Sequence, residues 1–178
     1  MGLATAATSA ETSAETSIVI AIGSNRPHGR HGRPAEVVRA AVKALGEAGF
    51  AAGAVSPILA TRAMGPGGRD YANAVMTSST RLAPPQIVAA LKAVERSFGR
   101  RGGRRWGARV LDLDLITWGD GVWPAPLLWR QSRGIAVPHR AMHTRAFVLA
   151  PMLAVAADWK HPVFGLTVRQ MRARLRNG

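Results

Sequence analysis

The sequence contains no cysteine, which excludes disulfide bonds, thiolate metal sites and a cysteine nucleophile. It also lacks any apolar run close to the roughly 20 residues that a transmembrane helix requires. Aromatic residues are few, with one Tyr and four Phe, so the sequence offers little of the aromatic surface on which single-stranded RNA-binding sheets stack bases. With 47% hydrophobic and 19% charged residues among 178, the composition indicates one folded domain and excludes a wholly disordered chain.

Acidic residues are scarce as well, because 10 Asp and Glu stand against 24 Lys and Arg and leave a formal net charge of +14. Of these cations, 21 are Arg and three are Lys. A planar guanidinium binds phosphate through two parallel hydrogen bonds, so the surplus predicts an anionic partner, either a nucleic acid or a small phosphorylated molecule. Because Ala and Gly are also abundant, biased codon usage explains the arginines equally well, and their positions must decide which ones bind.

The first 16 residues are rich in Ser, Ala, Glu and Thr, and they predict a disordered tail. They contain neither a basic start followed by an apolar stretch nor any Arg, so they resemble neither a secretory signal nor a transit peptide. We therefore expect a cytoplasmic protein with a single domain over residues 17–178.

Hydrophobic periodicity predicts the order of the elements. Short apolar or alternating stretches predict strands at residues 17–22, 54–60, 72–81 and 109–118. A period near 3.6 predicts helices that begin at Pro34 and Pro84, and two more at residues 145–157 and 167–176. The order β-α-β-β-α-β with extra C-terminal helices predicts an α/β (α+β) fold of the ferredoxin-like type, in which helices pack on an antiparallel sheet.

The strand at residues 109–118 carries the clearest chemical signal. Side chains alternate along a strand, so the leucines at positions 111, 113 and 115 share one face, and Asp112 and Asp114 share the other. Two carboxylates about 7 Å apart repel each other unless solvent or a cation lies between them. Such a pair suits Mg²⁺, which completes its coordination with water and phosphate oxygens. The alternative is an exposed polar face paired with neighbouring arginines.

Arginines flank this strand. Four of them, including Arg100 and Arg105, lie in a glycine-containing stretch before it, and Arg109 precedes Asp112 by three positions. Guanidinium groups and a metal ion together neutralise a transferring phosphoryl group, so the combination predicts phosphoryl transfer. The common phosphate-binding loops are absent, so a nucleotide would be held mainly by arginines and metal. A basic RNA-binding module of the same fold and a metal-dependent phosphatase or nuclease are the alternative functions.

Two further groups of residues are candidates for substrate recognition. Tyr71 and Asn73 face the same way, so a ring and an amide could stack on and hydrogen-bond a heterocycle; an ordinary half-buried tyrosine is the alternative. His139 could donate to a phosphate, and a capping or core role fits its spacing equally well. His139 and His143 have the spacing of zinc ligands, but without Cys or a closer acid we do not expect zinc.

The most specific motif is RWGARVLDLD at residues 105–114. Weaker motifs accompany it in a fixed order: GSN at 23–25, GP at 65–66, DYANA at 70–74, VPH at 137–139, RAFVL at 145–149 and Pro151. Together they resemble the 6-hydroxymethyl-7,8-dihydropterin pyrophosphokinases of folate biosynthesis. The resemblance covers roughly residues 17–170.

The resemblance implies an enzyme that moves pyrophosphate from ATP to the hydroxymethyl group of the pterin and releases AMP. It implies that Asp112 and Asp114 bind two magnesium ions that bridge the ATP phosphates, and that Arg100 and Arg109 act with them in catalysis. The remaining implied contacts are to the pterin, from Thr61, Met64, Tyr71, Asn73 and Phe147, and to ATP, from Glu95, Arg105, Trp106, His139 and Arg145.

The family offers no obvious side-chain general base, so positioning, metal charge and loop closure are expected to supply most of the rate. The expected partners are ATP and hydroxymethyl-dihydropterin alone, with no nucleic acid and no membrane. We expect a monomer because nothing in the sequence indicates an interface. The chain departs from the family's pattern at Arg62, Gly102 and Arg140, and residues 123–133 are longer and more basic than usual; these departures concern the loops and nucleotide affinity.

Overall fold

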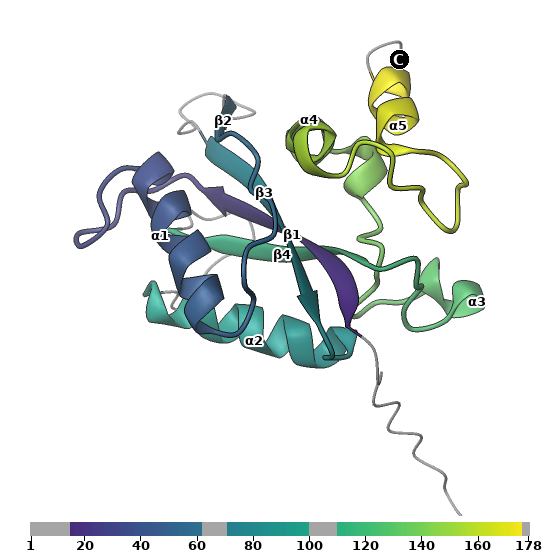
Figure 1. Ribbon diagram of the computed structural model, residues 1–178, viewed down its shortest axis with the longest axis horizontal. Helices are drawn as coiled ribbons and strands as arrows, with labels where there is room; N and C mark the ends of the chain where they lie inside the picture. The colour runs from purple at the N-terminus through teal and green to yellow at the C-terminus, as the bar shows by residue number, and fades with distance from the viewer. Residues whose placement is uncertain (1–14, 62–70, 100–109, 176–178) are drawn as a thin grey trace, which may run out of the picture.

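The computed structural model of the chain describes residues 15–61, 71–99 and 110–175 (Figure 1). Within these residues a four-stranded antiparallel sheet has the order β2-β3-β1-β4. Its strands are β1 (Thr16–Ser24), β2 (Leu59–Thr61), β3 (Tyr71–Thr80) and β4 (Asp112–Trp118). Helices α1 (Pro34–Glu47) and α2 (Pro84–Ser97) complete the βαββαβ order. The predicted α/β fold with an antiparallel sheet is therefore confirmed, and β4, which carries both aspartates, is an edge strand.

Helices α1 and α2 both begin with proline, whose fixed φ suits the first helical turn. In α1 the Glu36 carboxylate accepts a hydrogen bond from the Arg33 amide at 2.6 Å, and in α2 the Gln86 side-chain oxygen accepts one from the Ala83 amide at 2.9 Å. These contacts satisfy backbone donors just before each helix. The apolar residues of both helices then recur with the helical period and face the sheet.

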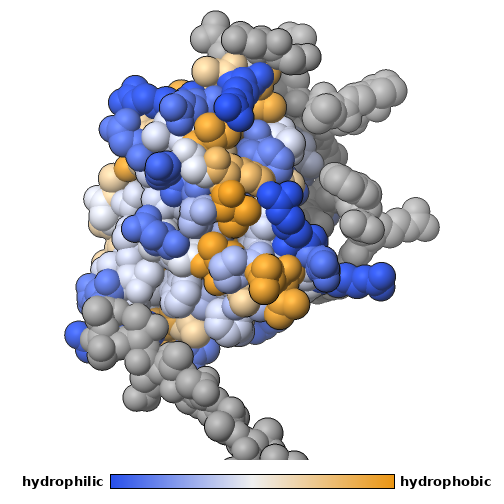
Figure 2. Space-filling model, turned by 90° about the vertical axis from the view of Figure 1, so that its right-hand side faces the viewer, coloured by the Kyte–Doolittle hydropathy of each residue, from blue (hydrophilic) through white to orange (hydrophobic). Residues whose placement is uncertain are grey.

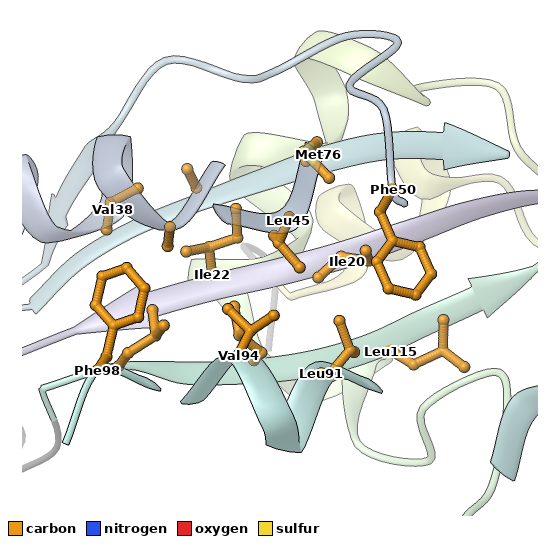
Figure 3. Close-up of a cluster of buried hydrophobic side chains, with 14 of the residues drawn as sticks. Ile20, Ile22, Val38, Leu45, Phe50, Met76, Leu91, Val94, Phe98 and Leu115 are labelled. Atoms are coloured by element: carbon orange, nitrogen blue, oxygen red, sulfur yellow. The ribbon is translucent and has the colours of Figure 1, made fainter. Parts of the chain in front are cut away.

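The main core lies between the sheet and these two helices (Figure 3). The sheet contributes alternate residues of β1 and β4, including Ile20 and Leu115, and the helices contribute Leu45 and Leu91, all of them buried. Phe50 and Phe98 extend the cluster beyond the ends of α1 and α2. This face of the sheet is therefore covered along its length by apolar side chains.

The opposite face is covered by helices α4 (Ala146–Val155) and α5 (Val168–Arg174), which follow a short helix α3 (Pro126–Trp129) and a 3₁₀ turn η1 (Met142–Thr144). Val19, Val75 and Ile116 of the sheet form a second buried cluster with residues of α4 and α5. The pairing of β1 with β4 shifts its register between Val19 and Ile20. Leu115 and Ile116 are consecutive residues and point to opposite faces, so one is buried in each cluster.

One predicted strand is shorter than expected. Of residues 54–60, only the end belongs to β2, although the Ser56 amide still donates to the Val75 carbonyl at 2.9 Å. Pro57 has no amide hydrogen and so interrupts regular pairing between these two parts. The other predicted strands and helices are present with small differences at their ends, and residues 1–14, which include most of the predicted tail, lie outside the described part.

Positive charge is spread widely over the surface. From residue 121 onward, nine Arg and Lys accompany a single acid, Asp158. Figure 2 views the side that carries α3 and α5, where apolar patches lie among hydrophilic side chains. The net charge alone therefore does not locate a functional site. No helix in the described residues is long and apolar enough to cross a bilayer.

Candidate active site

The two aspartates lie on β4 and face away from the main core. Asp112 pairs with Gly23 and Asp114 pairs with Ala21 across the β1–β4 ladder. Leu113 and Leu115 point into the main core and are buried, whereas the Asp114 side chain is 36% exposed. The alternation predicted from the sequence is therefore present, and it puts both carboxylates on the sheet face that α4 partly covers.

Asn73 lies on the same face, two strands away. It pairs with Gly23 on β1 and Leu59 on β2, and its side-chain amide donates to the Thr61 hydroxyl at 2.8 Å. A Cβ on Gly23 would lie only 3.2 Å from Asn73 Oδ1, so glycine leaves the amide oxygen room against the strand. Asp112, Gly23 and Asn73 therefore form one row across the sheet, with Thr61 at its β2 end.

Two aromatic rings border this row. Tyr71 begins β3 and pairs with Thr61, and Phe147 lies in the first turn of α4. Their side chains remain 37% and 40% exposed, which is unusual for rings beside a packed sheet face. Because α4 packs against β3, both rings are available on the side of the sheet that carries Asn73.

Arg145 links the aspartates to α4. It immediately precedes the helix, and its guanidinium lies 3.4 Å from Asp114 Oδ2. The guanidinium carbon is also 5.7 Å from the centre of the Phe147 ring. At this half-exposed position a long ion pair is weak, so Arg145 can exchange its carboxylate partner for another anion.

His139 is held beside the same aspartate. Its backbone amide donates to the Ile116 carbonyl at 2.9 Å, and its Nδ1 accepts from the Ala141 amide at 3.2 Å. Burial lowers the pKa of His139, the negative charge of Asp114 raises it, and Arg145 lowers it again; the net direction is downward. The lowered pKa favours the neutral ring, and because Nδ1 accepts from the Ala141 amide, the proton of that ring is on Nε2, where it can be donated to a ligand.

Glu95 lies beneath β4 and is fully buried. Its Oε1 accepts a hydrogen bond from the Leu113 amide at 2.8 Å and another from the Lys92 ammonium at 2.8 Å. Lys92 also donates to the Leu113 carbonyl at 3.4 Å. The family resemblance implied that Glu95 contacts the nucleotide, and the sequence did not single out Lys92. The available signal was that Lys92 and Glu95 stand three positions apart on α2.

A cleft of about 520 Å³ opens beside these residues. It lies between α2, β4 and residues 134–141, and its lining includes Lys92, Asp114, His139 and Arg145. A second cavity, of about 570 Å³, is lined by η1, residues 163–166 and α5. That second lining contains none of the predicted site residues, so we assign the site to the first cleft.

The structure thus brings together eight predicted residues on or beside one sheet face: Thr61, Tyr71, Asn73, Asp112, Asp114, His139, Arg145 and Phe147. Glu95 lies on the opposite side of β4. Met64, Arg100, Arg105, Trp106 and Arg109 fall outside the described residues, as do the departures at Arg62 and Gly102. His143, the other histidine of the possible zinc pair, packs against Phe164 with ring centres 4.9 Å apart.

Residues 19–157 match the family model described as 7,8-dihydro-6-hydroxymethylpterin-pyrophosphokinase (HPPK). The chain is similar to proteins named 2-amino-4-hydroxy-6-hydroxymethyldihydropteridine pyrophosphokinase. The relative from Haemophilus influenzae is 33% identical, and the match covers 78% of this chain and 81% of that protein. The relative from Pseudomonas aeruginosa is 36% identical, and the match covers 82% of this chain and 83% of that protein. A Synechocystis relative is 40% identical over 62% of this chain, which spans only 53% of that protein.

The fold is similar to that of the Plasmodium falciparum HPPK-DHPS triple mutant, crystallised with pteroate, with a TM-score of 0.65. The match covers 93% of this chain and 44% of that chain. At 9% identity, this similarity supports the fold alone.

Proposed function

Because the chain belongs to the family of 7,8-dihydro-6-hydroxymethylpterin pyrophosphokinases, transferases of folate biosynthesis, we propose that this chain itself transfers pyrophosphate from ATP to the hydroxymethyl group of the pterin. The observation that carries the proposal is the row on one sheet face, where two carboxylates stand at one end and a ring and an amide stand at the other. The carboxylates of such a row can bind a metal-bound polyphosphate, and the ring and amide can bind a flat heterocycle beside it. We further propose that the enzyme works in the cytoplasm as a monomer.

The carboxylates fit Mg²⁺. Asp112 and Asp114 project from alternate residues of one strand onto the open face, and Mg²⁺ takes one or two protein carboxylates and fills its remaining positions with water and phosphate oxygens. We propose that they hold two such ions. When bound there, magnesium would neutralise charge on the transferring group.

The 520 Å³ cleft beside Asp114 is the proposed ATP site. Arg145 can leave its long contact with Asp114 for a phosphate oxygen, and the neutral His139 can donate from Nε2. Arg100, Arg105 and Arg109 would add further phosphate contacts, with Trp106 beside them, but these four lie outside the described residues. The Lys92 ammonium also reaches the cleft wall.

The proposed pterin site surrounds Asn73. Tyr71 and Phe147 would pack against the two faces of the ring, and Asn73, with Thr61 beside it, would hydrogen-bond its polar edge. Met64 would belong to the same edge. The half-exposed rings support this assignment because they offer apolar area that the fold itself does not bury.

The proposed reaction needs little covalent help from the protein. The hydroxymethyl oxygen bonds to the β-phosphorus of ATP, the bond from that phosphorus to the α,β-bridging oxygen breaks, and AMP leaves while the hydroxyl proton passes to water. Arg145 and His139 would orient the phosphates, and Asn73 would orient the nucleophile by fixing the ring that carries it.

The products test the proposal. The protein is incubated with ATP, Mg²⁺ and hydroxymethyl-dihydropterin, and nucleotides and pterins are separated by chromatography. AMP and pterin pyrophosphate should appear in equal amounts, and only when the pterin is present. ADP would indicate simple phosphoryl transfer, pterin-independent phosphate release would indicate a phosphatase, and either result would contradict the proposal.

A further inference from the structure

The edge position of β4 creates a structural problem at Leu113. This residue stands between the two aspartates, and in the described part of the chain no strand pairs with the outer side of β4 to satisfy its amide and carbonyl. The structure solves the problem from α2, because the Leu113 amide donates to Glu95 Oε1 at 2.8 Å and the Leu113 carbonyl accepts from Lys92 at 3.4 Å. A single ion pair thus binds both backbone groups of one residue.

Lys92 and Glu95 are also bound to each other, with 2.8 Å between Nζ and Oε1. Glu95 is fully buried, whereas the Lys92 side chain is 36% exposed and lines the cleft beside Asp114. A buried carboxylate needs hydrogen-bond donors and a compensating charge. The Leu113 amide donates one such hydrogen bond and Lys92 provides a positive charge, so the pair ties α2 to the backbone of β4.

We propose that Lys92 and Glu95 are positioning residues that fix the Leu113 backbone and so set the directions in which Asp112 and Asp114 project. This inference rests on the proposed function, since it concerns how the two carboxylates present themselves to Mg²⁺ and ATP. The side chains of residues 112 and 114 leave the backbone on either side of Leu113. A rotation of its peptide groups would therefore move both carboxylates, and displacements near 1 Å cost a positioned site about a hundredfold in rate.

The pair therefore belongs to the site, although Glu95 is buried beneath β4. Loss of Glu95 leaves a buried amide without its acceptor and Lys92 without its charge partner. Loss of Lys92 removes the carbonyl contact and a positive charge next to the buried carboxylate. Both changes should act on the binding of Mg²⁺ more than on the pterin, whose proposed contacts lie on β2, β3 and α4.

Glu95→Ala and Glu95→Gln provide the test. The glutamine oxygen can still accept from the Leu113 amide, so it should restore most of what alanine removes. In the alanine variant, the Mg²⁺ concentration for half-maximal rate should rise at least about tenfold and kcat should fall about a hundredfold, while KM for the pterin stays within about threefold. Lys92→Met should show the same pattern with smaller changes. The matched controls are Lys43→Met and Glu47→Gln, which alter an exposed ion pair of 3.9 Å on α1 and should change nothing.

A second readout does not depend on turnover. In the metal-free protein, amide hydrogen exchange at Leu113 should quicken at least about tenfold in Glu95→Ala and be restored in Glu95→Gln. Titration with Mg²⁺ alone, followed by the amide shifts of residues 112–114, should give weaker binding in the alanine variant. Faster exchange with unchanged Mg²⁺ dependence would overturn the inference. A wild-type protein that forms no AMP would instead refute the proposed function, and an alanine variant that still binds Mg²⁺ normally would refute the positioning role.

Discussion

On one face of the sheet, α1 and α2 cover the strands and enclose the main core, whereas on the other face α4 and α5 cover one part and leave another open. The covered face presents Ile20, Leu113 and Leu115, all buried. The open part presents Asp114, Tyr71 and Phe147, each more than a third exposed. Strand β4 supplies residues to both sets, since successive residues of a strand point to opposite faces, whereas Phe147 comes from α4.

The difference teaches how a small domain can hold a polar site without weakening its core. Residues on the covered face contribute stability through buried apolar area. Residues on the open face contribute little stability, so they are available for ligands. The Lys92–Glu95 pair connects the two faces: it belongs to α2, which covers the main core, and it contacts the backbone of Leu113 between the two aspartates.

The largest effect should follow from loss of a carboxylate on the open face. Asp114→Ala should lower turnover about a thousandfold, because the metal would lose one of its two protein ligands. The midpoint of thermal unfolding should stay within a few degrees of wild type. Asp158→Asn, which changes an 84% exposed acid paired with Arg169, is the control and should keep full activity. Near-normal turnover of Asp114→Ala would remove the metal role.

On the covered face, the largest effect should be on stability. Ile20→Ala deletes a fully buried side chain between the sheet and its helices, and it should lower the free energy of unfolding by about 3 kcal/mol. Leu59→Ala, at a 37% exposed position of β2, should cost less than about 1 kcal/mol. Urea unfolding of the two variants measures both values. Equal losses would contradict the contrast between the faces.

A pH-sensitive histidine lies in the segment that connects α4 to α5, the two helices that partly cover the second face. His161 is fully buried, and burial, with a smaller contribution from His143, lowers its pKa from 6.5 to about 4. Between these values the unfolded chain binds a proton that the folded protein does not, so the free energy of unfolding should fall as the pH drops from 6.5 to 4. The fall should reach up to about 3 kcal/mol, and the contribution should be constant above pH 7.

Urea unfolding of wild type and His161→Gln at several pH values isolates this contribution, because other groups titrate in both proteins. His161 Nδ1 accepts from the Val163 and Phe164 amides, and a glutamine oxygen can replace that acceptor. Identical pH dependence in the two proteins would show that His161 does not titrate as described.

The smallest effect concerns the exposed ring on β3. Tyr71→Ala should raise KM for the pterin about tenfold to a hundredfold, because one stacking surface is lost. Tyr71→Phe keeps the ring and should stay within about twofold. Steady-state kinetics with varied pterin measures both, and an alanine variant with unchanged KM would place the pterin elsewhere.

Local patterns in the sequence were sufficient for much of the fold. The alternation of Leu and Asp at residues 111–115 predicted which carboxylates share a face, and the prolines at 34 and 84 marked two helix starts. Pairing between residues far apart in the sequence was harder to predict from local patterns. Pro57 shortened a strand whose composition favoured pairing.

The contact of Lys92 and Glu95 with Leu113 joins residues about 20 positions apart and depends on the packing of α2 against β4. Nothing in the local pattern distinguishes this pair from the exposed Lys43–Glu47 pair on α1. The motif resemblance implied that Glu95 contacts the nucleotide, which stays a prediction; its burial and its hydrogen bond to Leu113, on which the proposed positioning role rests, depend on tertiary structure. The phosphate contacts of the arginines at residues 100–109 stay predictions.

Amide chemical shifts offer the most direct test that the open face binds both substrates. Labelled protein is titrated with Mg²⁺, an α,β-methylene analogue of ATP and hydroxymethylpterin. Shifts should concentrate at Asn73, Asp114 and Arg145, while residues of the covered face such as Val38 and Leu45 remain unchanged. Shifts concentrated on α1 and the covered face instead would contradict this account.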